Sequence, residues 1–331
     1  KRQGVVVSST TIRISPSERL AGILPDVEIA AISSVIEEIE ELKQQRRAVV
    51  LAHNYMTPDI YHGVADLRGD SLALARMAVD TEADIIVMAG VHFMAETAKI
   101  VNESKTVLIP DMEAGCSLAE SITPGDIHLL RERYPGVPVV TYVNTSAEVK
   151  AESDICCTSG NAVQVVESLG TDQVIFLPDQ YLGRWVATQT DVGIILWEGS
   201  CMVHERFTGS ELREYRSQHR GIQIIAHPEC PPDVLEEADF VGSTAGMIDW
   251  VKREKPRKVV MVTECSMSDN VAVEATDTEF IRPCNLCPHM KKITLGGIRN
   301  SLANLESEVL VDSDVADRAR IAVQRMLEVK V

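Results

Sequence analysis

No run of apolar residues in this chain approaches the roughly 20 that a membrane-spanning helix requires. The first residues, KRQGVVVSSTTIRISPSERL, also lack the apolar segment and small-residue cleavage site of a secretory signal. With 331 residues, 45% of them hydrophobic, the chain can bury a large core over two or three domains or repeats. We therefore expect a soluble globular protein of the cytoplasm, with no membrane partner.

Concentrated positive charge is missing as well. The formal net charge is -17 at pH 7, and the basic residues are dispersed along the chain. Because binding to nucleic-acid phosphates depends on clustered Lys and Arg, the sequence predicts no nucleic-acid partner. An anionic substrate would then be held by local hydrogen-bond donors and helix ends.

The eight cysteines do not resemble a disulfide framework, which is typical of small secreted domains. Cys156, Cys157 and Cys265 lie in or beside apolar runs, so we expect them to be small core residues. Cys116 differs from them because it follows the turn in IPDMEAGC.

Cys116 has counterparts at a regular spacing, which indicates an internal repeat. Cys201 lies 85 residues after Cys116, and Cys287 lies a further 86 residues on. Cys116 and Cys201 each follow an apolar run and a Gly-containing turn, in TVLIPDMEAGC and GIILWEGSC. The segment EFIRPCNLC, which ends at Cys287, is a weaker version of this pattern.

Three further features recur in the same order. A β-branched run stops each time at polar residues: His53, Asn54 and Tyr55, then Tyr142, Asn144 and Thr145, then His227 and Glu229. An aspartate then precedes a hydroxyl residue by five positions: Asp66 and Ser71, Asp154 and Ser159, Asp239 and Thr244. A second apolar run ending in a turn follows: ADIIVMAG, DQVIFLPD and RKVVMVTE.

Four features in one order predict three copies of one α/β unit. Short apolar strands alternate with helical patterns such as DSLALARMAV, which is typical of buried parallel strands joined by helical crossovers. The predicted fold is three repeated three-layer α/β/α domains in a pseudo-three-fold arrangement around a central active site. The predicted boundaries are 1–27 for an N-terminal arm, 28–123, 124–207 and 208–290 for the repeats, and 291–331 for C-terminal helices.

The recurring polar residues predict a shared site, because ligands of parallel α/β sheets gather outside the carboxyl ends of the strands. Three such edges can face one cavity in a three-fold arrangement. Ser71, Ser159 and Thr244 are each placed where a helix is expected to begin. A hydroxyl beside free backbone N–H groups at a helix N-terminus is typical of a phosphate or carboxylate site, although each alone also fits an ordinary N-cap.

Cys116, Cys201 and Cys287 can meet near the pseudo-three-fold axis. A three-thiolate site suits zinc or an iron-sulfur cluster, and the residue pattern does not choose between these metals. A cubane cluster with three cysteine ligands would leave one iron open as a Lewis acid. An alternative interpretation takes Cys284 and Cys287 as a C-x-x-C redox pair, but the strand and helix that usually surround such a pair are not predicted here.

The residues resemble the quinolinate synthase family of de novo NAD biosynthesis. The segments that carry the resemblance span residues 48 to 295 in the order of the family's motifs: AHNY, GDSLALA, GVHFMAETAKI, PDMEAGCSLAES, YVNTSAEVKAESD, TSGNAV, PDQYLG, WEGSCMVHERF, HPEC, GSTAGMI and CNLCPHM. The resemblance implies α/β domains in a three-fold repeat around a 4Fe-4S cluster. It also implies a condensing and dehydrating transferase that makes quinolinate, phosphate and water from iminoaspartate and dihydroxyacetone phosphate, with an L-aspartate oxidase as functional partner.

Carried onto this chain, the resemblance assigns a role to each candidate residue. The implied cluster ligands are Cys116, Cys201 and Cys287. The residues implied in proton transfer, or close to the substrate, are Tyr55, Glu229, His53 and His227. The residues implied to hold carboxylate and phosphate groups are Ser71, Tyr142, Asn144, Ser159, His204, Ser243 and Thr244. Without the resemblance, His204 would be interpreted as a structural hydrogen-bonding residue.

One position departs from the family pattern. Some members have a further cysteine three residues before Cys284, where this chain has Ile281. A disulfide switch that uses that cysteine is therefore not expected, and pairing Cys284 with Cys287 would remove a cluster ligand. Two other classes stay open: another iron-sulfur dehydratase acting on a single hydroxy acid, and a non-enzymatic iron-sulfur or zinc sensor.

Overall fold

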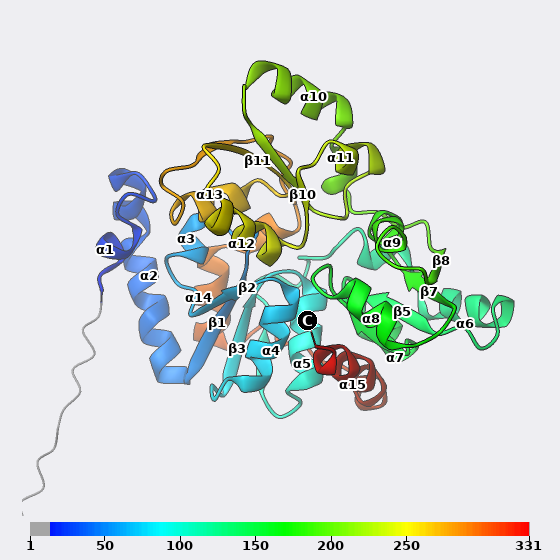
Figure 1. Cartoon of the computed structure of the whole chain (residues 1–331). Helices are drawn as coiled ribbons and strands as arrows, with labels where there is room; N and C mark the ends of the chain where they lie inside the picture. Colours follow the sequence, from blue (N-terminus) through cyan, green and yellow to red (C-terminus); the bar gives the residue numbers. More distant parts are fainter. Residues whose placement is uncertain (1–13, 331) are drawn as a thin grey trace, which may run out of the picture.

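The computed structural model of the chain describes residues 14–330 (Figure 1). Residues 1–13 of the predicted N-terminal arm lie outside this range. The described part of the arm holds the short helix α1 (Pro16–Leu20), which begins with a capping box between Ser15 and Glu18. Among residues 14–330, no helix combines the length and the apolar character that crossing a membrane demands.

Three parallel sheets of four strands form the framework of the molecule (Figure 1). The strand orders are β2-β1-β3-β4, β6-β5-β7-β8 and β10-β9-β11-β12, so the same order occurs three times. Neighbouring strands are parallel in each sheet, and helices connect and flank them. The predicted α/β fold of three repeated units is thus confirmed.

Each sheet belongs to a unit that begins with an α-helix and ends with a short 3₁₀ helix. The first holds α2 (Asp26–Arg46), β1 (Ala48–His53), α3 (Pro58–Tyr61), β2 (Leu67–Gly69), α4 (Ser71–Asp80), β3 (Ile85–Ala89), α5 (His92–Val101), β4 (Thr106–Leu108) and η1 (Ala119–Ser121). The second holds α6 (Pro124–Arg133), β5 (Val139–Tyr142), α7 (Ala147–Ala151), β6 (Ile155–Cys157), α8 (Ala162–Ser168), β7 (Gln173–Leu177), α9 (Gln180–Ala187), β8 (Gly193–Leu196) and η2 (His204–Arg206). The third holds α10 (Gly209–Gln218), β9 (Gln223–Ala226), α11 (Pro232–Glu236), β10 (Phe240–Val241), α12 (Thr244–Glu254), β11 (Lys258–Val262), α13 (Ser266–Ala272), β12 (Glu279–Ile281) and η3 (Met290–Lys292). The exact domain boundaries stay a prediction.

The third unit shows how three layers arise from short apolar strands. Successive side chains of a strand point to opposite faces of the sheet. Ile224 of β9 accordingly belongs to a cluster with Leu212 of α10 and Val234 of α11, whereas Ile225 packs with Met247 of α12 on the other face. Because both faces are buried, three consecutive residues of the strand, 224–226, are apolar rather than alternating with polar ones.

The recurring aspartates connect neighbouring strands in all three units. A side-chain oxygen of each aspartate accepts a backbone N–H from the first strand of its unit. The donors are Val50 for Asp66 at 2.8 Å, Val139 for Asp154 at 2.7 Å and Ile224 for Asp239 at 2.7 Å. A cation from the first helix of each unit pairs with them: Lys43 with Asp66, Arg131 with Asp154 and Arg216 with Asp239, at 2.7 to 3.0 Å. These aspartates therefore stabilise the sheets. The same hydrogen bond and the same ion pair recur in each of the three units.

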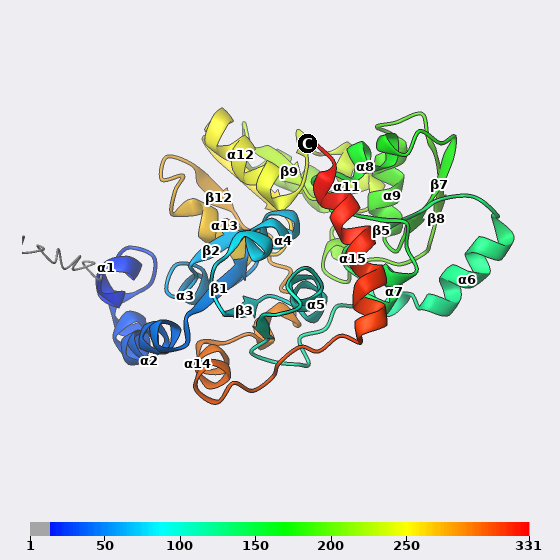
Figure 2. The same ribbon diagram turned by 90° about the horizontal axis from the view of Figure 1, so that it is seen from below.

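Two C-terminal helices pack against the units (Figure 2). Helix α14 (Leu295–Asn304) packs against α2 and β3 of the first unit. Helix α15 (Ser313–Glu328) packs against α5 of the first unit and against α7 and β6 of the second. From α15, Arg320 Nε donates to the carbonyl of Ile100 at 2.8 Å, and Arg318 forms an ion pair with Glu152 at 2.5 Å. The tail therefore holds the first two units together.

Candidate active site

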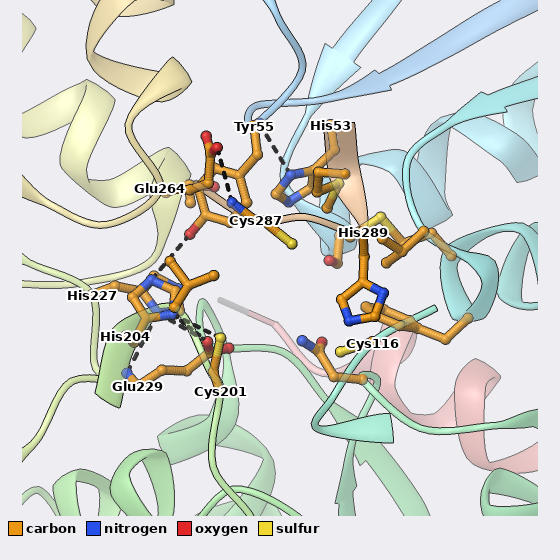
Figure 3. A pocket seen from close by; sticks show the side chains of 18 of the residues that line it. His53, Tyr55, Cys116, Cys201, His204, His227, Glu229, Glu264, Cys287 and His289 are labelled. Atoms are coloured by element: carbon orange, nitrogen blue, oxygen red, sulfur yellow. Dashed lines mark hydrogen bonds and ion pairs between the residues drawn. The ribbon is translucent and has the colours of Figure 1, made fainter. Parts of the chain in front are cut away.

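One cavity lies where the carboxyl ends of strands from the three units meet (Figure 3). His53 is the last residue of β1, Tyr142 is the last residue of β5, and His227 directly follows β9. All three side chains line the cavity. The rule that ligands of parallel sheets bind outside the carboxyl ends of strands thus leads to a single place in this fold.

The predicted site residues, all of which lie within residues 14–330, are brought together with a single exception. Those that line the cavity are Cys116, Cys201, Cys287, His53, Tyr55, His227, Glu229, Ser71, Tyr142, Asn144, Ser159, His204 and Thr244. Ser243 does not line it. Its hydroxyl instead caps α12 by accepting the backbone N–H of Gly246 at 3.2 Å. The roles given to these residues stay predictions.

Glu229 lies at the centre of a buried polar network. The hydroxyl of Tyr142 donates to its Oε1 at 2.5 Å, and Nδ1 of His204 lies 2.7 Å from its Oε2. Nδ1 of His227 is more distant, at 3.9 Å from Oε2. The rings of His204 and His227 are stacked with centroids 4.7 Å apart. All four side chains are at most 4% exposed, so their mutual contacts replace contacts with water.

Burial and these contacts set the protonation states of the network. Burial alone raises the pKa of Glu229, but attraction to His204 and hydrogen bonds from His204 and Tyr142 bring it below its ordinary value. Burial lowers the pKa of His53 and that of His227 to about 3, because a charged ring is poorly solvated there. At neutral pH the site therefore holds an ionised carboxylate at Glu229 and the neutral rings of His53 and His227.

Thr263 connects Tyr55 to His204 and was not found from the sequence. Its Oγ1 lies 2.6 Å from the hydroxyl of Tyr55 and 2.9 Å from Nε2 of His204. Burial raises the pKa of Tyr55 well above its ordinary value, so this hydroxyl stays protonated at neutral pH. Thr263 directly follows β11, so the strand-end rule would have found it had it been applied to the second apolar run of each unit.

The hydroxyl residues lie near helix starts in two units out of three. Ser71 is the first residue of α4, and Thr244 is the first residue of α12. Helix α8, in contrast, begins at Ala162 with Asn161 at its N-cap position, so the helix start predicted at Ser159 is wrong by three residues. Ser159 instead places its Oγ 3.2 Å from Nε2 of His227.

Two side chains of the cavity wall carry buried polar atoms that no other described residue satisfies. These atoms are Oδ1 of Asn144 and Nδ1 of His289. Buried polar atoms are normally paired, because an unpaired one has lost its water without gaining a partner. A ligand with a hydrogen-bond donor would satisfy Oδ1 of Asn144, because this atom is an acceptor. The anion-binding role predicted for Asn144 would use its side-chain N–H groups instead.

The three recurring cysteines line this cavity from three different units (Figure 3). Cys116 follows β4, Cys201 follows β8 and Cys287 follows β12, and each precedes a 3₁₀ helix. All three are free thiols. Burial raises the pKa of Cys116 to about 12 and also raises the pKa values of Cys201 and Cys287. Without a metal ion, these cysteines therefore stay protonated at neutral pH. A bound metal ion would favour the thiolate form instead, since a coordinating thiol is deprotonated.

A second set of donors shares one of these cysteines. Single donor atoms of Cys201, His204 and Glu229 lie within 4.8 Å of one another. Within this set, the Cys201 sulfur is 3.2 Å from Nδ1 of His204. A set of one thiol, one imidazole and one carboxylate suits zinc. The cavity therefore offers two overlapping donor sets, one of three thiols and one of mixed chemistry.

Comparison with known proteins identifies the family. The family described as Quinolinate synthetase A protein matches residues 37–328. The chain is 64% identical over 312 residues to quinolinate synthase 2 of Mesorhizobium japonicum, covering 94% of this chain and 96% of that protein. It is also 64% identical over 312 residues to quinolinate synthase of Agrobacterium fabrum, covering 94% and 90%. A relative from Caulobacter vibrioides with the same name is 59% identical over 298 residues, covering 89% and 81%. The chain belongs to the quinolinate synthetase A family.

Proposed function

We propose that this chain is a quinolinate synthase that condenses iminoaspartate with dihydroxyacetone phosphate and releases phosphate and water. Family membership over residues 37–328 and relatives at 64% identity support this assignment. The observation that carries it is the meeting of three thiols, the Glu229 network and the anion-binding hydroxyls in one cavity. The chemistry calls for acid-base groups, anion anchors and a Lewis acid, and no hydride carrier is needed.

The thiols fit a 4Fe-4S cluster as the resident cofactor. Cys116, Cys201 and Cys287 would hold it, one from each unit. The same cavity is lined by the hydroxyl, imidazole and carboxylate side chains of all three units, so a cluster held there would lie beside the groups proposed to bind substrate. When bound, a cluster with three protein ligands supplies an open iron that can act as a Lewis acid on a departing hydroxyl.

The side chains around the thiols supply proton transfer. Glu229, whose pKa lies below its ordinary value, is ionised at neutral pH and can accept a proton. Tyr55 keeps its hydroxyl proton and can donate it, with Thr263 and His204 continuing the hydrogen-bonded chain behind it. His53 and His227 are neutral and buried, so they orient substrate groups without adding positive charge.

The hydroxyl and amide groups supply the anion anchors. Ser71 and Thr244 lie at the N-termini of α4 and α12, where free backbone N–H groups and the helix dipole favour negative charge. Asn144 and Ser159 lie on the second unit and face the same cavity. These groups would bind the carboxylates of iminoaspartate and the phosphate of the second substrate.

The proposal is tested on protein purified without oxygen. Iron, zinc and sulfide are measured, and quinolinate is assayed from iminoaspartate and dihydroxyacetone phosphate. Four irons per chain together with quinolinate are expected. Iron without quinolinate would favour a dehydratase or a sensor, and zinc in place of iron would favour the set formed by Cys201, His204 and Glu229.

The supply of substrate and the compartment belong to the same proposal. Iminoaspartate is unstable in water, so an L-aspartate oxidase is the expected functional partner that produces it. We place both in the cytoplasm. The dispersed basic residues and net charge of -17 support the expectation that nucleic acid is not a partner.

A further inference from the structure

The segment that carries Cys287 is less buried than those that carry the other two cysteines. The residues two positions before and after Cys116 and Cys201 are buried: Ala114 and Leu118, Gly199 and Val203. Around Cys287 the corresponding residues, Asn285 and His289, are only half-buried. The alternate residues of this segment are exposed: Cys284, Leu286 and Pro288. Apolar packing therefore holds Cys287 less firmly than it holds Cys116 or Cys201.

A buried carboxylate contacts the Cys287 segment directly. The side chain of Glu264, which follows Thr263 at the end of β11, is completely buried. Its Oε1 accepts the ammonium of Lys291 at 2.9 Å and the backbone N–H of Cys287 at 3.4 Å. Its Oε2 accepts the backbone N–H of Ser266 at 2.9 Å. A buried carboxylate without such donors would be strongly unfavourable, so these contacts are needed to compensate the charge of Glu264 inside the protein.

Lys291 uses all three of its N–H donors at this point. Besides Glu264, its Nζ donates to the hydroxyl of Ser266 at 2.6 Å and to the backbone carbonyl of Tyr55 at 3.1 Å. Ser266 begins α13 of the third unit, whereas Tyr55 lies in the loop after β1 of the first unit. The Glu264–Lys291 pair thus joins the Cys287 segment to α13 of the third unit and to the loop after β1 of the first unit. The contact in that loop is with the backbone of Tyr55, whose hydroxyl is proposed to donate a proton.

The other two units have no such pair among the described residues. Four positions after each cysteine, the backbone N–H donates to the cysteine carbonyl in all three units, at 3.0 to 3.2 Å. The residues at this position in the first two units are exposed glutamates: Glu120 and Glu205. The counterpart of Glu264 in the second unit is Asp179, as the bridges from Asp179 to Gly199 and from Glu264 to Asn285 indicate. Asp179 caps α9 instead of meeting a lysine.

We propose that Glu264 and Lys291 are positioning residues that fix residues 284–292, keep the Cys287 thiol beside Cys116 and Cys201, and hold the backbone of Tyr55 in place. The roles of Cys287 and Tyr55 in this inference rest on the proposed function. The claim that Glu264 and Lys291 fix residues 284–292 does not rest on it, because that claim concerns only how the segment is held against the first and third units.

The test measures hydrogen-deuterium exchange and iron release on the full-length protein purified without oxygen. The variants are Lys291→Met, Glu264→Gln and the conservative Lys291→Arg. Lys292→Met is the matched control, because the neighbouring lysine pairs with Glu113 at 3.2 Å on the surface, where the side chains are 37% and 83% exposed. Exchange is followed in residues 284–292 and, as an internal reference, in β5.

Lys291→Met and Glu264→Gln are expected to speed exchange in residues 284–292 by about tenfold or more while β5 is unchanged, because the opening is local. Iron release to a chelator should accelerate by about the same factor. Lys291→Arg should restore both rates to within about threefold of the original protein, and Lys292→Met should change neither. If Glu264→Gln fails to fold, the lysine variants decide alone.

Unchanged exchange and iron release in Lys291→Met would overturn the proposal, and so would an equal acceleration in Lys292→Met. The comparison of exchange rates between Lys291→Met and Lys292→Met tests the positioning role of Glu264 and Lys291 whether or not iron is bound. Absence of iron from the original protein would contradict the proposed cluster, while the exchange rates would still support or overturn the role of Glu264 and Lys291.

Discussion

Tyr142 donates a hydrogen bond of 2.5 Å to Glu229 across the boundary between the second and third units. The two residues lie 87 positions apart in the sequence. Tyr142 ends β5 and Glu229 lies in the loop after β9, the equivalent strand of the third sheet, so the repeat itself brings them face to face. The buried network around Glu229 is therefore formed by the packing of two units, and a single unit contains only one side of it.

Replacing Glu229 with glutamine should abolish most turnover without removing the metal. The amide keeps the shape of the side chain but cannot accept a proton, so kcat should fall by about 10²- to 10⁴-fold. Quinolinate formation and iron content are measured on the same anaerobic preparation. Glu236→Gln, on the exposed face of α11, should behave like the original protein. Normal turnover of Glu229→Gln would show that this carboxylate is not the acid-base group.

Thr263→Val should lower kcat while the protein stays folded. Valine matches threonine in shape but removes the hydroxyl between Tyr55 and His204. Losing two hydrogen bonds, each worth about 1 kcal/mol, predicts a decrease of about ten- to a hundredfold. Thr141→Val is the control, since Thr141 is equally buried but contacts Ser153 at 2.6 Å away from the site. Equal effects of the two substitutions would argue for a general packing defect.

Cys116→Ala should lose both iron and activity, because one of the three proposed ligands is removed. Iron content and the visible spectrum of anaerobic protein report the loss. Cys156→Ala provides the comparison: Cys156 is completely buried in β6 but lies outside the cavity lining, so this variant should keep its iron. A Cys116→Ala protein with four irons would exclude the three-thiol arrangement.

The buried histidines make folding stability fall as the pH decreases. The pKa of His53 and that of His227 are lowered to about 3 in the folded state, whereas an unfolded histidine titrates near 6.5. Between these values the unfolded chain binds more protons, so the free energy of unfolding rises with pH and falls on acidification. The expected loss is about 1 kcal/mol per histidine for each pH unit below 6.5.

Urea unfolding of the metal-free protein at pH 7.5, 6.5 and 5.5 measures this slope. In His227→Gln, only one of the two buried histidines remains to titrate, so the free energy of unfolding should depend less steeply on pH. A free energy of unfolding that rises on acidification would contradict the assigned protonation states.

The sequence predicts the fold and the meeting of the three cysteines in one cavity, because the repeat strengthens weak signals. A cysteine after a turn carries little information alone, but the spacing from Cys116 to Cys201 to Cys287 excludes most chance explanations. The same holds for the strand ends at His53, Tyr142 and His227. Their placement follows from the rule for parallel sheets, so a correct count of units is enough to gather them into one site.

Thr263 could have been found by the same rule, because it directly follows β11. Glu264 and Lys291 could not, because their pairing does not recur in the other units. Thr263 contacts His204 of the second unit, whereas Glu264 and Lys291 pair within the third unit. The corresponding positions of the first and second units carry different residues. The start of α8 was misplaced for a related reason. Asn161 accepts the backbone N–H of Thr158 and forms a local turn, which delays the helix beyond the position expected from the other two units.

Each unit contributes one cysteine to the cavity, and this has an evolutionary consequence. An ancestral unit with a single cysteine would complete a three-thiol site only as a symmetric trimer. In such a trimer every substitution would occur three times around the axis, including at positions where one copy is useful and three would collide. Three units in one polypeptide are free of that restriction. Lys291 illustrates this freedom, because it meets a carboxylate in one unit and has exposed glutamates as its counterparts in the others.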